Sequence, residues 1–334
     1  MKIVRKFSVY FKKMSNYNSG IKNRIFSLSP KLEIILRRIY YKNKFILEGL
    51  AKNAQKSKKS SSKKIDFLEF IDFLKSKGVK NGRNIILHSS YAPFSNSNLS
   101  PQEIINSFLE LIGKEGTLVM PAIPFFPNKN QVLTTKNIQD KNIYEYDVQN
   151  SKITTGVLPK MLFEREDSAR SRHPINTIVA VGRLKDELLK DNLVGSNSMP
   201  CGKESGWYKS IKHDFFIVGL GTDLMHSMTS IHINEDISEN EWLIKNWYEE
   251  KIFLIKDKDF TKTVSLKKRK DIWGALYWPE RTQCEDLYKE GRMSGEIIQG
   301  INIEVVKSRE VFQSIKEKGF PYPYIWLPLN EKNL

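Results

Sequence analysis

The sequence has few cysteines and histidines and no long apolar segment. Its 334 residues include two cysteines, Cys201 and Cys284, and five histidines. Two cysteines cannot build the disulfide framework of a small secreted protein. No apolar run approaches the roughly 20 residues that span a bilayer, and no secretory signal with a small-residue cleavage site opens the chain. Together these absences predict a cytoplasmic protein.

Acidic residues are scarce in the first part of the chain. Residues 1–64 contain 18 Lys and Arg against two acids, Glu33 and Glu48, which gives a net charge of +16. The whole chain has 54 basic and 38 acidic residues, so residues 65–334 hold 36 of each and are neutral. A nucleic-acid partner would therefore depend on the basic tail alone, and the neutral body does not favour one.

The basic tail shows two patterns that are typical of amphipathic helices. Residues 2–14 place apolar side chains at helical spacing among lysines and arginines. A second candidate helix over 30–50 follows Ser29, which can cap it, and has Pro30 at its first position. Basic helices of this kind bind anionic membrane surfaces, so we expect residues 1–50 to lie on the inner face of the cytoplasmic membrane. The alternative is that these helices pack on the body or on a second subunit.

A change of composition separates the tail from the body. Residues 51–64 are rich in Lys and Ser and cannot build a core, so they are predicted to be a linker. From residue 65 to 334 apolar strand-like segments alternate with amphipathic helical ones. This alternation predicts one α/β domain with a mixed, largely parallel sheet that is covered by helices on both faces. The expected strands are 83–90, 116–125, 177–182 and 214–221, and the clearest helices are 65–79 and the segment that follows Ser100.

Several common functional signatures are missing from the body. It contains no phosphate-binding G-x-x-x-x-G-K-[ST] loop and no G-x-S-x-G nucleophile elbow. His226 and His232 are six residues apart and Cys201 is isolated, so no metal site is expected. The stretch 240–290 holds four of the six tryptophans and is predicted to be an insertion or a substrate-facing region. Its basic run 267–273 is expected to be a solvated turn.

One short motif has the residue types of a general base. In T-x-x-H-x-x-E, His232 and Glu235 are three residues apart and share one face of a helix. A carboxylate can hold a neutral imidazole in the tautomer that removes a proton from an amine. Thr229 or nearby backbone N–H groups could donate hydrogen bonds to a tetrahedral intermediate. Taken alone, an H-x-x-E pair is more often structural, and the other motifs decide between the two interpretations.

Seven segments of the body occur in a characteristic order. Together they resemble the aminoglycoside 3-N-acetyltransferase, or antibiotic N-acetyltransferase, family over about residues 66–315. The most specific features are H-[SA]-S, G-T-L-V-M-P, R-S-x-H-P and T-x-x-H-x-x-E. The segments are LHSSYAPFS (87–95), GKEGTLVMPAIPF (113–125), YDVQNSKITTGVLPKMLF (146–163), ARSRHPINTIVAVG (169–182), MPCGKESGWYKSI (199–211), DFFIVGLGTDLMHSMTSIHINED (214–236) and EGRMSGEIIQGINIEVVKSREVF (290–312).

The resemblance implies a three-layer αβα fold, unrelated to that of the GNAT acetyltransferases, and a direct transfer from acetyl-CoA to an amine. It implies that His232 is the catalytic base and Glu235 its acidic partner. No metal or redox cofactor is implied, and Cys201 is not expected to carry the acyl group. The positions that match CoA-binding segments of the family are His88, Ser89, Ser90 and Tyr91 along the pantetheine arm, and Arg170, Ser171 and His173, with Arg170 suited to a phosphate. For His173 a purely structural role is the alternative.

Departures from the family pattern bear on the acceptor. Tyr91 and Pro93 replace smaller or aliphatic residues, and Lys160 stands where many members have Glu. The segment 199–211 is similar to members from polysaccharide biosynthesis, so we expect the acceptor to be the amine of a nucleotide- or lipid-linked amino sugar. The alternatives are an antibiotic-resistance aminoglycoside acetyltransferase, a catalytically silent binding protein at the membrane, and a nucleic-acid-binding protein led by the tail. The exact acceptor, the acyl chain length and a homo-oligomeric state are left open by the sequence.

Overall fold

A computed structural model describes residues 29–42, 64–126, 143–193 and 198–330. The predicted helix at 2–14 and nearly all of the predicted linker lie outside these ranges. Within them, no helix is both long enough and apolar enough to cross a membrane.

A seven-stranded sheet forms the centre of the body. The pairings of β1 with β2 and with β6 are parallel, and the other four pairings in this sheet are antiparallel, so the parallel part is smaller than predicted. The prediction of a mixed sheet is confirmed, with a parallel part that is confined to the three central strands. Gln299 and Gly300 have positive φ and join the last two strands by a tight turn, which makes that pair antiparallel. The spatial order is β4 (Ala169–Arg170), β5 (Ile178–Gly182), β2 (Thr117–Pro121), β1 (Asn84–Ser89), β6 (Phe216–Leu220), β10 (Ile301–Lys307) and β9 (Met293–Ile298).

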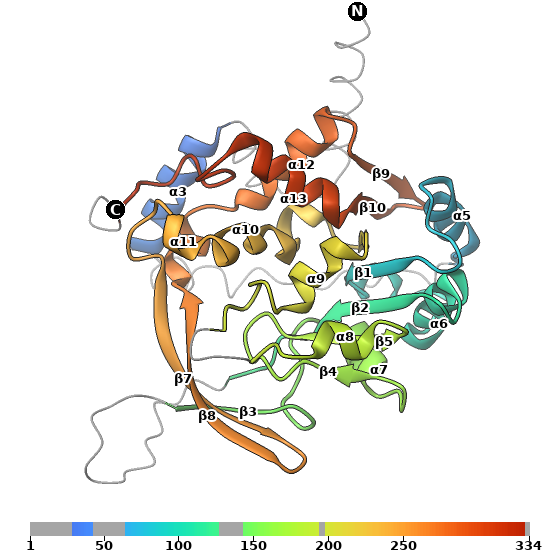
Figure 1. Cartoon of the computed structure of the whole chain (residues 1–334). Helices are drawn as coiled ribbons and strands as arrows, with labels where there is room; N and C mark the ends of the chain where they lie inside the picture. Colours follow the sequence, from blue (N-terminus) through green and yellow to red (C-terminus); the bar gives the residue numbers. More distant parts are fainter. Residues whose placement is uncertain (1–28, 43–63, 127–142, 194–197, 331–334) are drawn as a thin grey trace, which may run out of the picture.

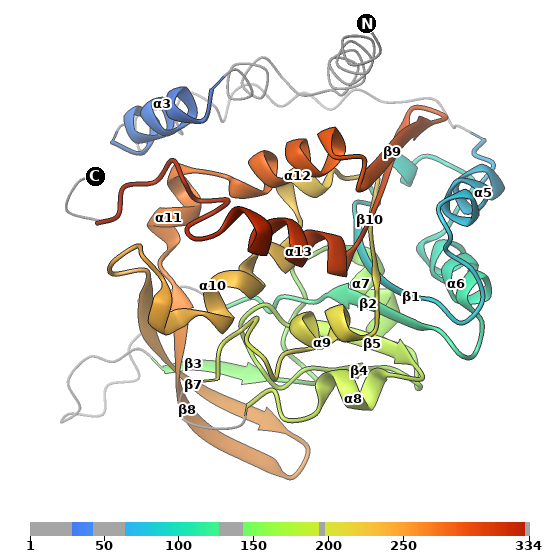
Figure 2. The same ribbon diagram turned by 45° about the horizontal axis from the view of Figure 1, so that its top comes forward.

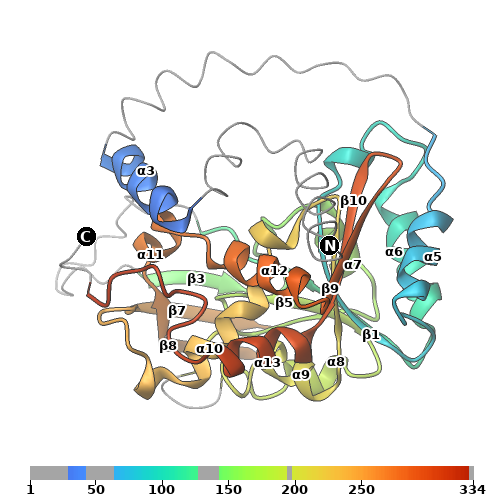
Figure 3. The same cartoon turned by 90° about the horizontal axis from the view of Figure 1, so that it is seen from above.

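Helices cover both faces of this sheet because successive strand residues point to opposite sides. Ile85 and Leu87 of β1 join one apolar cluster, whereas Ile86 joins the other. The first cluster is covered by α5 (Leu68–Ser76), α6 (Pro101–Ile112) and α7 (Val157–Phe163). The second is covered by α8 (Lys185–Leu189), α9 (Gly206–Lys212), α10 (Ile233–Ile237), α12 (Pro279–Lys289) and α13 (Ser308–Lys318). This arrangement is the predicted three-layer αβα fold, and Figure 3 shows α5 and α6 on one side of the strands and α12 and α13 on the other.

A second, three-stranded sheet extends from the lower part of the body in Figure 1. It consists of β3 (Ile143–Asp147), β7 (Tyr248–Asp257) and β8 (Phe260–Arg269), and it has a small apolar core of its own. Much of the predicted insertion 240–290 thus forms a long hairpin. The expectation that 267–273 is a solvated turn is wrong, because residues 267–269 end β8 and α11 (Asp271–Leu276) follows directly.

Helix α3 (Pro30–Lys42) packs on the body, above α11 and α12 in Figure 2. Its Glu33 carboxylate is 1% exposed and accepts hydrogen bonds from Arg281 at 3.0 Å and from Arg37 at 2.8 Å. The Arg37 guanidinium also lies 4.3 Å from the centre of the Trp278 ring. For residues 30–42 the structure therefore shows the alternative that the sequence left open, a helix that docks on the body.

Candidate active site

The T-x-x-H-x-x-E segment follows β6, at the carboxyl end of a central strand. Gly221 begins the connection with φ of +65°, and a Cβ there would lie 2.4 Å from the carbonyl oxygen of Ser90, so the turn requires glycine. Two short 3-10 helices follow, η2 (Leu224–His226) and η3 (Thr229–His232), and α10 continues from η3. The predicted single helix is thus a junction of two helix types, and His232 is the last residue of the first.

His232 and Glu235 contact each other across this junction. Nδ1 of His232 lies 2.9 Å from Oε1 of Glu235, and the side chains are 12% and 1% exposed. An ionised carboxylate accepts hydrogen bonds only, so when Glu235 is ionised Nδ1 carries the proton and Nε2 keeps its lone pair. Among the described residues no hydrogen bond to Nε2 is found. The geometry is that of a base whose free nitrogen is available to a proton donor.

Burial has opposite effects on the two members of this pair. Burial and the positive charge of Arg269 together lower the pKa of His232 to about 3, against the opposing charge of Glu280, so the imidazole is neutral at physiological pH. Burial raises the pKa of Glu235 to about 7, while the charge of Arg269 and the neighbouring Tyr324 and Trp247 side chains oppose this rise. The arrangement keeps the histidine neutral and holds the carboxylate close to its titration point.

The pair lines a cavity of about 150 Å³ whose walls are rich in carboxylates. Asp236 and Asp271 join Glu235 there, against Lys268 and Arg269. Asp236 also lines a second cavity of about 360 Å³, to which Glu204 and Glu241 contribute two acids and Lys203 one base. Because burial raises the pKa of Asp236 to about 8 and that of Glu235 to about 7, these two groups carry little negative charge at neutral pH. The exposed acids Glu204 and Glu241 of the second cavity are the groups that can attract ammonium groups.

The predicted pantetheine-binding residues stand at the end of β1. His88 is 3% exposed and stacks on Trp207 with 6.1 Å between the ring centres, and the hydroxyl of Tyr91 donates to the carbonyl oxygen of Leu99 at 2.7 Å. Both of these side chains are thus engaged in packing or bonding within the fold. Ser89, Ser90 and Tyr91 are all half-buried, and the backbone N–H of Ser90 donates to the carbonyl oxygen of Leu220 just before the turn that leads to His232, so a ligand can reach this loop.

Arg170 does not fit the predicted contact with a CoA phosphate. Its side chain is 4% exposed, and its terminal nitrogens donate to the carbonyl oxygens of Ser151 and Ala122, each at 2.7 Å. Its guanidinium also lies 5.2 Å from the centre of the Tyr146 ring. A guanidinium whose donors are directed to buried carbonyl groups holds β4 against the neighbouring loops and has no accessible edge for a phosphate.

Ser171 and His173 have similar structural positions. The Ser171 hydroxyl accepts a hydrogen bond from the backbone N–H of Ile178 at 3.2 Å. The His173 ring is 3% exposed, and its two nitrogens lie 3.0 Å from the carbonyl oxygen of Ile175 and 3.2 Å from that of Ser198. The structural alternative for His173 is therefore the one that the geometry supports, and the named residues of the R-S-x-H-P segment are buried while Arg172 between them is exposed.

Two residues that the sequence did not point to complete the surroundings of His232. The Tyr324 hydroxyl lies 3.0 Å from Nδ1, and Nη1 of Arg269 lies 3.5 Å from the same atom. Arg269 belongs to the basic run that was predicted to be a turn, and Tyr324 belongs to the C-terminal segment PYPYIW. The only sequence signal for either was the local richness in charge or aromatic residues.

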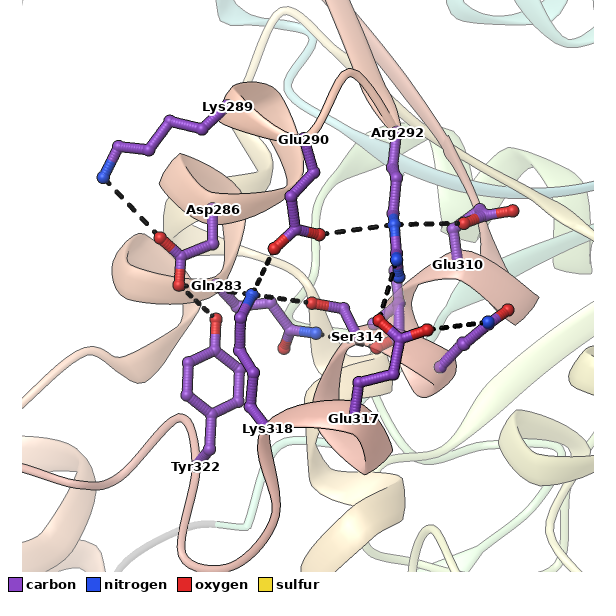
Figure 4. A network of polar contacts seen from close by, with 12 residues as sticks. Gln283, Asp286, Lys289, Glu290, Arg292, Glu310, Ser314, Glu317, Lys318 and Tyr322 are labelled. Atoms are coloured by element: carbon purple, nitrogen blue, oxygen red, sulfur yellow. Dashed lines mark hydrogen bonds and ion pairs between the residues drawn. The ribbon is translucent and has the colours of Figure 1, made fainter.

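A polar network holds the C-terminal segment in place. Figure 4 shows side chains of α12, α13 and the chain that follows joined by hydrogen bonds and ion pairs. The Tyr322 hydroxyl donates to Asp286 at 2.9 Å, and Arg292 donates to Glu317 at 2.7 Å. Because these contacts fix the position of Tyr322, they also place Tyr324, two residues later, beside His232.

The described residues around His232 include no cluster of metal-ligating side chains, and the thiol of Cys201 is buried. In the described part of the chain no three His, Cys, Asp or Glu side chains are grouped as metal ligands. Cys201 is fully buried, and burial together with the neighbouring Asp236 raises the pKa of its thiol well above the usual value. Thr229 is half-buried beside His232, and its hydroxyl lies 3.5 Å from the carbonyl oxygen of Ser227.

The chain is similar to known acetyltransferases. The model of a family described as aminoglycoside 3-N-acetyltransferase matches residues 86–317. Aminoglycoside N(3)-acetyltransferase IX of Micromonospora chalcea is 26% identical over 168 residues, which are 48% of this chain and 58% of that protein. The match thus spans less than two thirds of this relative.

Solved structures at low sequence identity share the fold. The aminoglycoside acetyltransferase AAC-IIIb in a binary complex with CoASH has a TM-score of 0.63 and 17% identity, over 78% of this chain and 100% of that one. A mutant of AAC(3)-IVa in complex with apramycin has a TM-score of 0.58 and 17% identity, over 82% of this chain and 97% of that one. The three-layer fold expected from the motifs is thereby confirmed.

Proposed function

This chain belongs to the aminoglycoside 3-N-acetyltransferase family, and we propose that it transfers the acetyl group of acetyl-CoA to the amine of an aminoglycoside-type acceptor, with His232 as the general base. The observation that supports this most directly is the His232–Glu235 pair, with Nε2 free, at a cavity rich in carboxylates. The family match and the fold agree with this chemistry.

In the proposed reaction the amine nitrogen attacks the carbonyl carbon of the thioester. Nε2 of His232 takes a proton from the amine as the new C–N bond forms, and the C–S bond then breaks. The departing sulfur receives a proton and leaves as the CoA thiol, and the acceptor leaves as its N-acetyl derivative. Thr229 and backbone N–H groups of η3 are the candidate donors to the tetrahedral oxyanion.

The donor is proposed to lie along the loop after β1. A structural neighbour was solved with CoASH, which supports a CoA thioester as the donor. Ser89 and Ser90 carry half-buried hydroxyls, and the backbone of Ser90 lies beside the Gly221 turn, so these are the groups that we assign to the pantetheine arm. Arg170, with its donors directed to carbonyl groups, is left out of the binding site.

The second cavity and a structural neighbour support a polycationic acceptor. The exposed acids Glu204 and Glu241 line that cavity, with Lys203 as a base. A nucleotide- or lipid-linked amino sugar, which the sequence favoured, would bring phosphate toward these two carboxylates, and like charges repel. An aminoglycoside carries ammonium groups and no phosphate, and a structural neighbour binds apramycin.

The test is a measurement of CoA thiol release by the purified full chain with a panel of acceptors. Acetylation of apramycin or gentamicin, confirmed by mass spectrometry and lost in His232→Ala, is the expected result. Turnover only with a nucleotide-linked amino sugar would replace the acceptor by the one that the sequence favoured. Acetyl-CoA binding without turnover on any acceptor would instead support a silent binding protein.

The membrane location of residues 1–50 is kept as a proposal. Helix α3 uses Glu33, Ile34 and Arg37 to contact the body, and it leaves Ile35 and Ile39 each 54% exposed on its outer side. These two apolar side chains, next to the basic charge of the tail, are consistent with contact to an anionic lipid surface.

A further inference from the structure

Nδ1 of His232 is surrounded by groups from three elements that are far apart in the sequence. Glu235 of α10 lies at 2.9 Å, the Tyr324 hydroxyl from the C-terminal segment at 3.0 Å, and Nη1 of Arg269 from β8 at 3.5 Å. We propose that Arg269 and Tyr324 are positioning residues that keep Glu235 ionised and thereby fix His232 in the tautomer that acts as a base. This inference rests on the proposed function and adds two residues outside the T-x-x-H-x-x-E motif.

The donors and acceptors around Nδ1 allow few arrangements. Arg269 can only donate, and it donates to the Tyr324 hydroxyl oxygen at 3.4 Å. The Tyr324 hydroxyl lies 3.0 Å from Nδ1. Burial raises the pKa of Glu235, and the nearby Arg269 and Tyr324 side chains oppose this rise. The remaining proton, on Nδ1, is directed to Oε1 of Glu235. The 2.9 Å contact with Glu235 is the shortest of the three at Nδ1, so an ionised Glu235 holds the ring proton on Nδ1 and leaves Nε2 without one.

Arg269 is held in place by more than its hydrogen bonds. Its guanidinium lies 6.0 Å from the centre of the Trp247 ring, and Trp247 stacks on Trp273 with 5.3 Å between the ring centres. Its pKa is raised by the surrounding acidic groups Tyr324, Glu235 and Glu280, so the side chain stays charged. A fixed positive charge at this place opposes the protonation of Glu235.

The other charged groups that face His232 act in known directions. Glu280 of α12 is buried and raises the pKa of the imidazole, while Arg269 lowers it. Asp236 stands next to Glu235, and burial together with the charge of Glu235 raises its pKa to about 8. The protonation of Nδ1 therefore depends on the positive charge of Arg269, which opposes the effects of the neighbouring carboxyl groups.

Loss of Arg269 is expected to reverse the tautomer. Without its charge, Glu235 would remain protonated at a higher pH, and a protonated carboxyl group donates a hydrogen bond. Nδ1 would then accept that hydrogen bond and the proton of the ring would move to Nε2, the position that must receive the proton of the amine. The base would be blocked although both members of the dyad are present.

The experiment compares Arg269→Met, Arg269→Lys and Tyr324→Phe with the native chain, and Arg183→Met serves as the matched control. Arg183 is an exposed arginine at the end of β5 that pairs with Glu115. In the native chain kcat/KM should fall as the pH drops through about 7, the pKa of Glu235. In Arg269→Met this fall should begin at a higher pH, with a loss of about tenfold in rate for each unit of the shift.

Arg269→Lys keeps the charge, so it should retain the native pH profile better than Arg269→Met, and Tyr324→Phe should shift the profile by less. The affinity for acetyl-CoA, measured by calorimetry, should be unchanged in all of them. An Arg269→Met profile that is lower at every pH but has the native midpoint would show a merely structural role and overturn the inference.

A second measurement is independent of activity. Nitrogen NMR of protein labelled at histidine, with His232 assigned from the spectrum of His232→Gln, reports which ring nitrogen is protonated. We expect protonation at Nδ1 in the native chain and at Nε2 in Arg269→Met. An unchanged tautomer would overturn the inference even if the native chain acetylates no acceptor, whereas a lack of turnover with the expected tautomers would contradict only the proposed function.

Discussion

Replacement of Glu33 by Ala tests whether α3 is an integral part of the fold or a removable tail. The Glu33 carboxylate is 1% exposed and its partner Arg281 is 6% exposed, with 3.0 Å between their charged atoms. The carboxylate also accepts from Arg37 and from the backbone N–H of Trp278. The substitution would leave Arg281 buried beneath the helix without this carboxylate.

The size of the effect follows from the burial of the pair. Removal of one partner of a buried ion pair costs about 3–5 kcal/mol, because the other charge stays in a medium that solvates it poorly. Replacement of both partners by apolar residues of similar volume is often close to neutral. Glu33→Ala should therefore lower the free energy of unfolding by about 3–5 kcal/mol, and the double variant Glu33→Leu with Arg281→Met should recover most of it.

Urea unfolding of the full chain, followed by tryptophan fluorescence, measures both variants. Glu69→Ala is the control, because Glu69 is an exposed glutamate in the first turn of α5. A change within about 0.5 kcal/mol for Glu33→Ala, equal to that expected at an exposed site, would refute the buried pair. In that case α3 would be bound loosely, and a chain that starts at Lys64 would be as stable as the full one.

Four further predictions follow from the site and the tail. His232→Ala should lower kcat by about 10²–10⁴-fold with acetyl-CoA binding retained, and Glu235→Gln should lower kcat less. Steady-state kinetics and calorimetry check both variants, and full activity in His232→Ala would exclude His232 as the base. Arg170→Met should lower the stability of the fold but leave the affinity for acetyl-CoA unchanged, whereas the opposite result would return Arg170 to the binding site. Folding raises the pKa of Glu235 to about 7 and that of Asp236 to about 8, so their contribution to stability is complete below their unfolded-state pKa values and is lost as the pH rises through 7 and 8. Urea unfolding at a series of pH values should show this loss of stability, and the double variant Glu235→Gln with Asp236→Asn should reduce its dependence on pH. Vesicle sedimentation should show that the full chain binds anionic but not neutral lipid and that Ile35→Ser with Ile39→Ser weakens this binding, whereas equal binding by both chains would remove α3 from the contact.

The elements of the body could be predicted from the sequence because they depend on neighbours along the chain. Ser100 caps α6 in a reciprocal capping box with Glu103, and both residues lie within four positions of each other. The apolar strands β1, β2, β5 and β6 follow their predicted segments because a fully buried strand must be apolar on both faces. The contact between His232 and Glu235 is also local, since a spacing of three residues brings side chains together in any helical turn.

The use of each charged residue was decided by the tertiary structure. An arginine is suited to bind a phosphate, and the sequence predicted that role for Arg170. Its position on an edge strand instead directs its N–H donors to the carbonyl groups of adjacent loops. Glu33 was read as one of two acids in a basic tail, yet it forms a buried pair with a residue 248 positions away. Whether a charge is solvated or buried depends on what packs above it, and no local pattern contains that information.

The surroundings of the base depend most strongly on distant parts of the chain. Arg269 lies 37 positions from His232, at the end of the long β7–β8 hairpin. Tyr324 lies 92 positions from His232, after α13. Sequence spacing indicates which residues share a helical face, but it does not give the register of β8 or the course of the C-terminal segment. The register of β8 and the course of the C-terminal segment are set by the packing of α12, α13 and the second sheet. The sequence could single out His232, but its charge and its tautomer depend on the neighbours that this packing brings to it.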